Sequence, residues 1–258
     1  MTIKVLIPVH KEPVEFLRRS INSVLMQPVD GVEVLVLLSG ADRMDPSRGY
    51  LDALCAEHPQ VRLRVHGARL TASQARNALI DWSQEDAGGG HTIAFLDADD
   101  EWLPNHLSQY LATRAAHGLG MDPADGETSL YSAPYMQRQS RRPVRPQGED
   151  PTIWSLTRQP LLLSSMILTH IPTELRFRGR GAEDLIFYAD GLRLMDRFMA
   201  GSEQSVIYDQ GNWAQKTTLW KLKRSYRTYM AIFENPLKAA FFVGLFSVHY
   251  MWRRAFGA

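Results

Sequence analysis

The stretch IAFLDADD at residues 93–100 joins four apolar residues directly to a group of carboxylates. Its apolar part follows three glycines at 88–90 and predicts a short buried strand. In a parallel sheet the carboxylates would emerge at the carboxyl edge of that strand, where ligands of open α/β sheets bind. In an extended backbone, Asp97 and Asp99 would point to one side and Ala98 to the other.

Two neighbouring carboxylates repel each other, which costs stability unless a cation lies between them. A hard divalent cation takes oxygen ligands and often keeps water and phosphate oxygens in its shell. The stretch therefore indicates a cation site with a phosphate-bearing ligand. The alternative is a solvated acidic turn that begins the next helix, because aspartates favour turns.

The composition is that of an ordinary globular protein, with 258 residues, 45% hydrophobic and 22% charged, enough for one large α/β domain or two small ones. A formal net charge of +1 gives no electrostatic reason to expect a nucleic-acid partner. The single cysteine, Cys55, cannot form an internal disulfide, and the N-terminus lacks the apolar region of a signal peptide. We therefore expect a cytoplasmic protein.

The first half of the chain alternates predicted strands and helices. Apolar runs at residues 3–9 and 32–38 flank an amphipathic helical pattern, which predicts a βαβ unit with parallel strands. Residues 61–65 alternate as a further strand, and Thr71 with Gln74 forms a capping box ahead of a helix. These patterns predict an α/β fold with a mixed, mostly parallel sheet flanked by helices.

The middle of the chain carries two charged groups with open interpretations. Residues 117–150 form a looser stretch rich in glycine, proline and charged residues, and four arginines lie in it between residues 138 and 145. They are either part of a solvated loop or an arm that meets an anionic group. Glu183 and Asp184 precede a helical pattern, where the helix dipole favours acids, so they are either a structural cap or functional carboxylates.

The tail at residues 216–258 has a different character. Basic residues alternate with leucines and aromatic residues, and an uncharged run follows at 239–252. This run is shorter than the ~20 residues that a bilayer span needs. A basic segment followed by an aromatic-rich apolar helix favours peripheral membrane contact, and a core or homodimer helix is the alternative. We predict a main domain at 1–215 and a helical tail at 216–258.

Four motifs together resemble family 2 glycosyltransferases. They are VLIPVH at residues 5–10, ARN at 75–77, IAFLDADD at 93–100 and the Glu-Asp pair at 183–184. Their order and rough spacing are similar to those of the family up to about residue 200. The resemblance implies a GT-A fold, a nucleotide-sugar donor, a divalent cation (Mn²⁺ or Mg²⁺), and inversion at the anomeric carbon.

The resemblance also implies roles for single residues. Asp99 would bind the metal, while Asp97 and Ala98 would contact the nucleotide sugar. Asp184 would act as the general base that accepts the proton of an acceptor hydroxyl, which is typically worth 10²–10⁴-fold in rate. Glu183 would support acceptor binding.

The N-terminal loop and the ARN motif complete the nucleotide-sugar site that the resemblance implies. Its further members are Pro8, His10, Glu12 and Arg76, with Arg76 placed to reach the diphosphate. For His10 a structural role in the loop is the alternative, and for Arg76 a surface position at a helix start. Lys11 stands where the family usually has asparagine.

A second departure concerns the nucleotide base. The family usually has Asp-Asp-Gly-Ser after the second strand, and the first aspartate reads the base, often uracil. This chain has LSGA at residues 38–41, and the side chain of Leu38 cannot accept a hydrogen bond. Either Asp42 or a backbone group takes over this contact, or the donor is not the commonest one, a uridine diphosphate sugar.

These observations lead us to expect a metal-dependent inverting glycosyltransferase. Its acceptor would be a glycan or a lipid-linked molecule, in surface polysaccharide or glycolipid synthesis at the cytosolic face of the membrane. A nucleotidyltransferase is one alternative, but it predicts a glycine-rich phosphate loop where this chain has PVHK at 8–11. The other is a non-catalytic partner of a membrane synthase complex.

Overall fold

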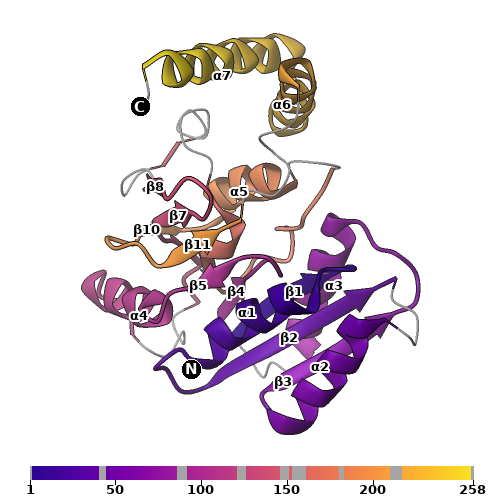
Figure 1. Cartoon of the computed structure of the whole chain (residues 1–258). Helices are drawn as coiled ribbons and strands as arrows, with labels where there is room; N and C mark the ends of the chain where they lie inside the picture. Colours follow the sequence, from indigo (N-terminus) through magenta and orange to yellow (C-terminus); the bar gives the residue numbers. More distant parts are fainter. Residues whose placement is uncertain are drawn as a thin grey trace.

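The computed structural model describes residues 2–40, 45–85, 92–120, 126–145, 151–152, 161–179, 183–209 and 217–256, with 218, 246 and 249–256 as backbone alone. In this part of the chain the main sheet has seven strands in the order β10-β6-β9-β4-β1-β2-β3 (Figure 1). Strand β9 runs antiparallel to β4 and β6, and the other recorded pairs in this sheet are parallel. The predicted mixed, mostly parallel sheet is therefore confirmed. Its strands are β1 (Ile3–Val9), β2 (Val32–Ser39), β3 (Val61–His66), β4 (Thr92–Phe95), β6 (Ser129–Ser132), β9 (Met166–Thr169) and β10 (Arg197–Ala200).

Helices cover both faces of the first half of this sheet. On β1, Val5 and Ile7 pack in one core cluster with α1 and α2, while Leu6 packs in the other with α3. Because both faces are buried, β1 is apolar except for Lys4, whose Nζ donates to the carbonyl of Ser83 at 2.7 Å. The predicted capping box is present, since Thr71 N–H donates to Gln74 Oε1 at 2.9 Å. These helices are α1 (Val14–Leu25), α2 (Pro46–Glu57) and α3 (Ala72–Glu85).

The strand order reverses between β1 and β4. From β1 the chain moves outward through β2 and β3, and then returns to place β4 on the other side of β1. In open α/β sheets, ligands bind outside the carboxyl ends of the strands at such a reversal. Residues 10–12 follow β1 and residues 96–100 follow β4, so the fold brings these two predicted parts of the site to one place.

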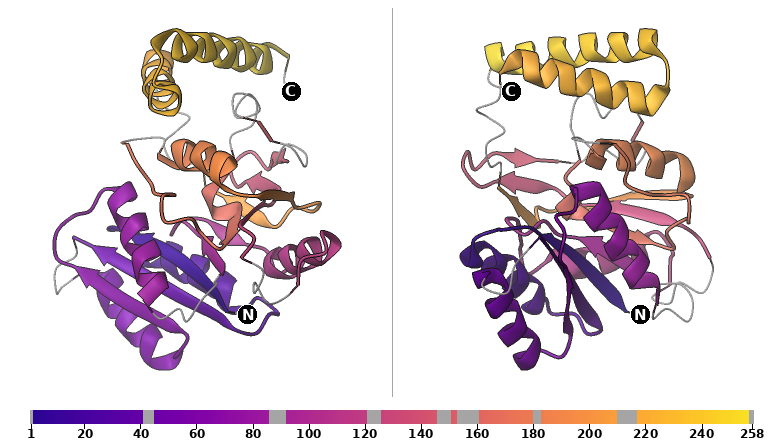
Figure 2. Two further views of the ribbon diagram at one scale, coloured as in Figure 1. Left: turned by 180° about the vertical axis from the view of Figure 1, so that it is seen from behind. Right: turned by 90° about the vertical axis from the view of Figure 1, so that its right-hand side faces the viewer.

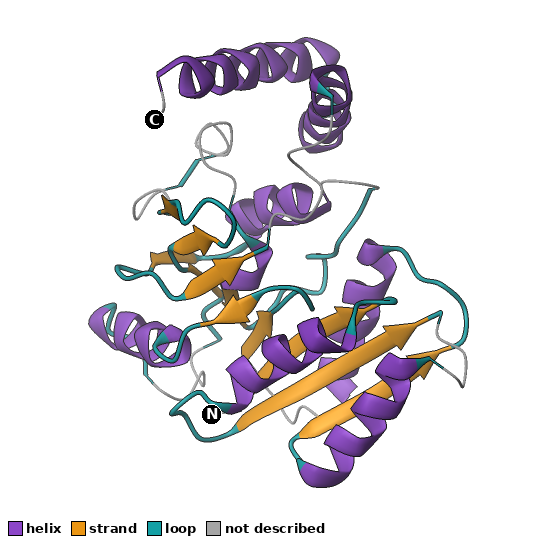
Figure 3. Ribbon diagram, in the orientation of Figure 1, coloured by secondary structure: helices purple, strands orange, loops and turns teal. Residues whose placement is uncertain are grey.

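A second sheet, whose four strands have the order β5-β11-β7-β8, lies beside the part of the first sheet that contains β4 and β10 (Figures 1 and 3). The segment expected to be loose, 117–150, contributes β6, β7 and β8 to the two sheets. That part of the expectation was wrong, because strands of two to four residues are too short to show a period. The strands of the second sheet are β5 (Glu101–Trp102), β7 (Tyr135–Gln137), β8 (Pro143–Val144) and β11 (Val206–Tyr208).

The predicted helical tail forms two helices, α6 and α7, that lie together beyond α5 (Figure 2). Tyr229, Ile232, Ala239 and Phe242 of this pair are buried in the same core cluster as Phe187 of α5. Among the described residues, no helix is both long and apolar enough to cross a membrane. The remaining helices are α4 (His106–Ala116), α5 (Glu183–Leu194), α6 (Thr218–Phe233) and α7 (Pro236–Phe256), with a 3₁₀ turn, η2 (Leu163–Ser165).

Candidate active site

The acidic stretch after β4 folds into a turn. The N–H of Asp100 donates to the carbonyl of Asp97 at 3.0 Å, and β4 ends at Phe95. The expected extended geometry is therefore wrong, because strand pairing ends before the aspartates and these residues favour turns. Asp97 and Asp99 nevertheless lie close enough for the charge of Asp97 to raise the pKa of Asp99.

Asp100 has a structural role in this turn. Its side chain is fully buried and accepts hydrogen bonds from Ser164 Oγ and from the N–H of Asp209 (2.8 Å). Ser164 Oγ also accepts from the N–H of Asp97 at 3.0 Å. Burial and the charges of Asp97 and Asp99 raise the pKa of Asp100 well above its usual value. Of the three aspartates, Asp100 is thus the one that ties the turn to η2 and β11.

Asp99 lies in surroundings of its own charge sign. Burial, followed by the charges of Asp97, Asp209 and Glu12, raises the pKa of Asp99 to about 7. At neutral pH this carboxyl group is therefore poised between its protonated and ionised forms. A bound cation would favour the ionised form.

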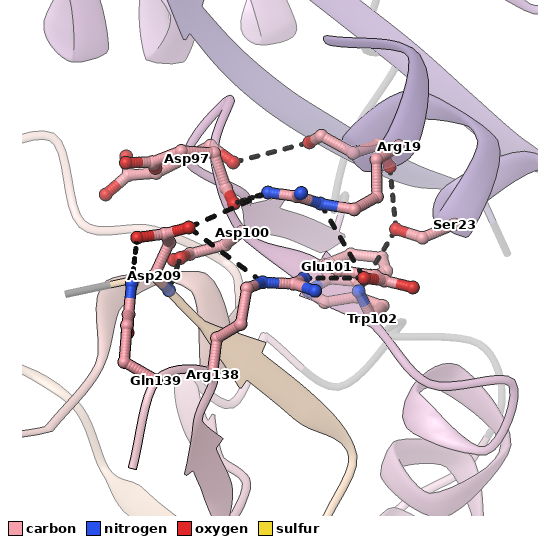
Figure 4. A network of polar contacts seen from close by, with 11 residues as sticks. Arg19, Ser23, Asp97, Asp100, Glu101, Trp102, Arg138, Gln139 and Asp209 are labelled. Atoms are coloured by element: carbon pink, nitrogen blue, oxygen red, sulfur yellow. Dashed lines mark hydrogen bonds and ion pairs between the residues drawn. The ribbon is translucent and has the colours of Figure 1, made fainter. Parts of the chain in front are cut away.

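Two arginines enclose the turn on its outer side (Figure 4). Arg19 of α1 donates to the carbonyl of Asp99 at 2.6 Å and lies 3.7 Å from Glu101 and 3.9 Å from Asp209. Arg138, at the end of β7, pairs with Glu101 at 2.6 Å. Of the four arginines in the middle of the chain, Arg138 therefore binds within the protein, while the other three are exposed.

Arg76 of α3 joins the two predicted acidic motifs. Its Nη2 lies 2.7 Å from Asp97 Oδ1, and its Nη1 lies 3.0 Å from Glu183 Oε1. Burial alone would lower the pKa of Arg76, but the carboxylates of Asp97 and Glu183 hold it above its usual value. The guanidinium also lies over the ring of Phe177, 5.4 Å from its centroid. Arg76 is therefore a buried connector between the turn after β4 and the start of α5, not a surface residue.

Asp184, in the first turn of α5, is flanked by charges of both signs. Its Oδ1 lies 4.0 Å from Nη2 of Arg224, which comes from α6. Burial and the charge of Glu183 raise the pKa of Asp184, while Arg224 and Arg76 oppose this shift. The side chain of Asp184 is still 43% exposed, so a ligand in solution can reach it. An accessible carboxylate with a raised pKa suits a general base.

The loop after β1 is held by its own side chains. The Nδ1 of His10 lies 2.8 Å from the carbonyl of Ser39, and a carbonyl only accepts, so Nδ1 carries the proton. The N–H of His10 donates to the Glu12 carboxylate. Lys11 between them has a φ of 60°, a conformation that asparagine tolerates better than lysine. His10 and Glu12 thus fix the loop beside the point where the strand order reverses.

Two predicted contacts with the nucleotide sugar, Pro8 and Ala98, have little side chain to offer. Pro8 pairs with Leu37 inside the sheet, and Ala98 is 4% exposed and packs in the core. Leu38 is fully buried, which agrees with its inability to read a base. Asp42, its proposed substitute, lies outside the described residues.

The acidic turn fits a divalent cation in charge but supplies few ligands. Burial is the main cause of the raised pKa of Asp99, and repulsion by its acidic neighbours adds to it. Within the described ranges, no three His, Cys, Asp or Glu side chains form a ligand set. A cation here would therefore take part of its shell from water and from a phosphate ligand, as Mg²⁺ commonly does.

Several residues around these carboxylates had no local signal in the sequence. Ser164 is 64 positions from Asp100 and Asp209 is 109 positions from it, so only folding brings them together. Arg19 belongs to a helical surface pattern, and Arg224 to the basic tail, where nothing in the spacing points to an acidic partner. Arg138 was one of four arginines with two open interpretations.

Comparison with known proteins agrees with this geometry. Residues 4–122 match the family described as glycosyl transferase family 2. A glycosyltransferase of Nostoc sp. described as uncharacterized is 33% identical over 94 residues, which is 36% of this chain. The match spans 27% of that relative's length. The resemblance predicted from the motifs is thus confirmed over this part of the chain.

Solved structures confirm the GT-A fold. S. aureus TarS, residues 1–349, in complex with UDP-GlcNAc superposes with a TM-score of 0.68 at 14% identity, over 99% of this chain and 73% of that one. A mannosyltransferase of Pyrobaculum calidifontis in complex with GDP-Man and Mn²⁺ gives a TM-score of 0.58 at 14% identity, over 99% of this chain and 76% of the other. At these identities the likeness shows the fold alone.

Proposed function

We propose that this protein is an inverting glycosyltransferase that moves a sugar from a nucleotide-sugar donor to a hydroxyl group of an acceptor. The observation that carries the proposal is the arrangement around Arg76, which ties Asp97 of the acidic turn to Glu183 beside Asp184. This arrangement supports a site with a donor end and an acceptor end. The match of residues 4–122 to glycosyl transferase family 2 supports the same reaction class.

In the proposed reaction the acceptor oxygen attacks the anomeric carbon while the bond from that carbon to the diphosphate breaks. The nucleoside diphosphate leaves with the bonding electron pair, and Asp184 accepts the hydroxyl proton. Because the nucleophile and the leaving group lie on opposite sides of the carbon, the configuration inverts. Glu183, held by Arg76 at 3.0 Å, keeps the start of α5 and thus Asp184 in position.

We propose that Asp99 holds a divalent cation, Mn²⁺ or Mg²⁺, together with the donor diphosphate. When bound, such a cation neutralises the charge that develops on the leaving diphosphate. Burial, together with the charges of Asp97, Asp209 and Glu12, raises the pKa of Asp99 to about 7, and this acidic neighbourhood supports the assignment. Asp97 would face the nucleotide side of the same turn, with Pro8, His10, Glu12 and the backbone of Ala98 nearby.

The nucleotide and the acceptor are assigned by class only. The buried Leu38 weakens the case for uracil, and the related folds are seen with UDP-GlcNAc and with GDP-Man. The acceptor would be a glycan or a lipid-linked molecule in surface polysaccharide or glycolipid synthesis on the cytosolic side. Acceptor specificity does not follow from the fold.

A thermal-shift panel of nucleoside diphosphates and sugar nucleotides, including those of uridine and guanosine, each with and without Mn²⁺ or Mg²⁺, tests the donor site. A ligand that binds only the folded state adds ~2.7 kcal/mol of stability at a hundredfold excess over its dissociation constant. We expect one nucleotide to raise the Tm, and to do so more strongly with metal. If none of them shifts the Tm, the protein is a non-catalytic partner of another enzyme. A nucleotidyltransferase would instead be stabilised by nucleoside triphosphates.

A further inference from the structure

The helices α6 and α7 each present an exposed stripe away from the core. On α7 the stripe is apolar: Leu237 is 81% exposed, Phe241 55% and Val248 59%. On α6, Leu219 is 62% exposed, and Trp220 and Tyr226 are 42% and 39% exposed. On α7 the members are four and seven residues apart, and on α6 Leu219 and Tyr226 are seven apart, with Trp220 next to Leu219, so each stripe lies on one side of its helix. Large side chains in such number are unusual on a free surface.

Basic residues accompany these apolar stripes. Lys223, Arg227 and Lys238 are exposed on the same two helices, against one exposed acid, Glu234. Lysines are depleted from the cores of protein–protein interfaces. Lysine and arginine beside exposed tryptophan, tyrosine and leucine are instead typical of helices that lie in a membrane interface. The composition therefore favours an anionic lipid surface over a second copy of the chain.

The orientation of α6 links this surface to the candidate active site. Tyr229 and Ile232 fix one side of the helix in the core, and Arg224 on its flank reaches Asp184 at 4.0 Å. The exposed stripe with Lys223 and Arg227 lies on the other side. A helix with its side chains is about 10–12 Å across. A surface that touches the stripe would therefore lie roughly one helix diameter from the candidate base.

We propose that the outer faces of α6 and α7 dock on an anionic membrane surface, with the aromatic and aliphatic side chains at the level of the lipid headgroups. This mode of binding needs no spanning segment. It brings Asp184 close to the membrane plane, where a lipid-linked acceptor would carry its hydroxyl group.

Sedimentation of the full chain with vesicles tests the docking surface. We expect binding to vesicles of phosphatidylcholine with phosphatidylglycerol, weaker binding to phosphatidylcholine alone, and a loss of binding as salt is raised. Phe241→Glu should weaken binding at least about tenfold, because it removes an anchor worth ~1.5–3 kcal/mol when buried. Lys223→Gln and Arg227→Gln should each cost about fivefold, at ~1 kcal/mol per basic residue.

The matched control is Met26→Glu, an equally drastic change at a site that is 72% exposed after α1, far along the chain from the tail. It should bind vesicles like the wild type, and the Tm of each variant reports whether the fold is intact. Equal binding of Phe241→Glu and wild type to anionic vesicles would overturn the proposal. So would a wild-type dimer that Phe241→Glu converts to a monomer without any binding to vesicles.

The docking surface and the proposed reaction can fail separately. Phe241→Glu should keep the metal-dependent Tm shift with the donor nucleotide, because the substitution lies outside the candidate active site. If the wild type binds anionic vesicles but no nucleotide sugar, the proposed reaction falls and the docking surface stands.

Discussion

The two groups of carboxylates in the site carry the same kind of charge in opposite surroundings. Asp99 is surrounded by Asp97, Asp209 and Glu12, and its pKa rises to about 7. Asp184 has an acidic neighbour too, but Arg224 and Arg76 oppose the rise of its pKa. Two arginines therefore counter the rise at Asp184, whereas only acids act by charge on the pKa of Asp99. A cation site and a base site need this difference.

The largest effect is expected from replacing the candidate general base, Asp184. Asp184→Asn should lower the rate of sugar transfer by roughly 10²–10⁴-fold, because the acceptor hydroxyl loses its proton acceptor. Donor binding, measured by the thermal shift, should remain, since the acidic turn is untouched. Asp190→Asn, on the same helix but paired with Arg178, is the matched control and should keep its rate. Loss of donor binding in Asp184→Asn would show that the base assignment is wrong.

The second prediction concerns Arg76, which connects the acidic turn to the start of α5. Arg76→Met leaves the carboxylates of Asp97 and Glu183 without their common partner, and losing one member of a buried charge pair costs ~3–5 kcal/mol. Denaturant unfolding measures this loss. Arg64→Met is the control, because its pair with Glu85 is 43% and 51% exposed and such pairs are worth ~1 kcal/mol or less. Equal losses in both variants would mean that Arg76 does not hold the site together.

The third prediction concerns Asp99, the candidate ligand of the divalent cation. Asp99→Asn should reduce metal-dependent donor affinity by ~10–100-fold or more, the cost of losing even an outer partner of a metal site. With a chelator present, donor binding should be no weaker than in the wild type, because a charge that repels the diphosphate has gone. Titration of donor binding with and without Mn²⁺ distinguishes the two conditions. If Asp99→Asn binds the donor more weakly both with Mn²⁺ and with chelator, Asp99 contacts the donor directly and does not act through the metal alone.

The same variant should change how stability depends on pH without metal. The pKa of Asp99 is raised from 3.8 in the unfolded chain to about 7 in the fold, so the folded state holds its proton more tightly. Protonation of Asp99 therefore contributes most to stability at low pH, and this contribution is lost as the pH rises from about 4 to about 7. In Asp99→Asn this part of the fall should be absent from a series of Tm values in chelator.

The smallest effect is expected from replacing Arg224, the arginine beside Asp184. The charged groups that face Asp184 are Glu183, Arg76 and Arg224, and Tyr208 also lies near it. Arg224→Gln removes an opposing cation at 4.0 Å, so the pKa of Asp184 should rise. The acidic limb of kcat/KM should then move to higher pH by about half a unit to one unit, because such a pair near water is worth ~1 kcal/mol.

Arg224→Lys should restore the wild-type pH profile, since it keeps the charge. Lys223→Gln, next along α6 and exposed, should leave the profile unchanged in an assay without vesicles. An unchanged pH profile in Arg224→Gln would show that the charge of Arg224 does not affect the pKa of Asp184.

The sequence predicted the parts of this protein that depend on local or repeated patterns. The apolar runs gave β1 and β2, the capping box gave the start of α3, and the acidic stretch marked the carboxyl end of β4. These signals lie within one element or one turn, where side-chain period and backbone preference act directly. The order of the motifs also indicated the glycosyltransferase resemblance.

Only the tertiary structure decided how the acidic residues differ from one another. In the sequence Asp97, Asp99 and Asp100 are near equivalents, but Arg76, the neighbouring acids and Ser164 give each of them different surroundings. The partners come from far along the chain, as Arg224 does for Asp184. Electrostatic effects depend on distance and burial in space, which a local pattern does not contain.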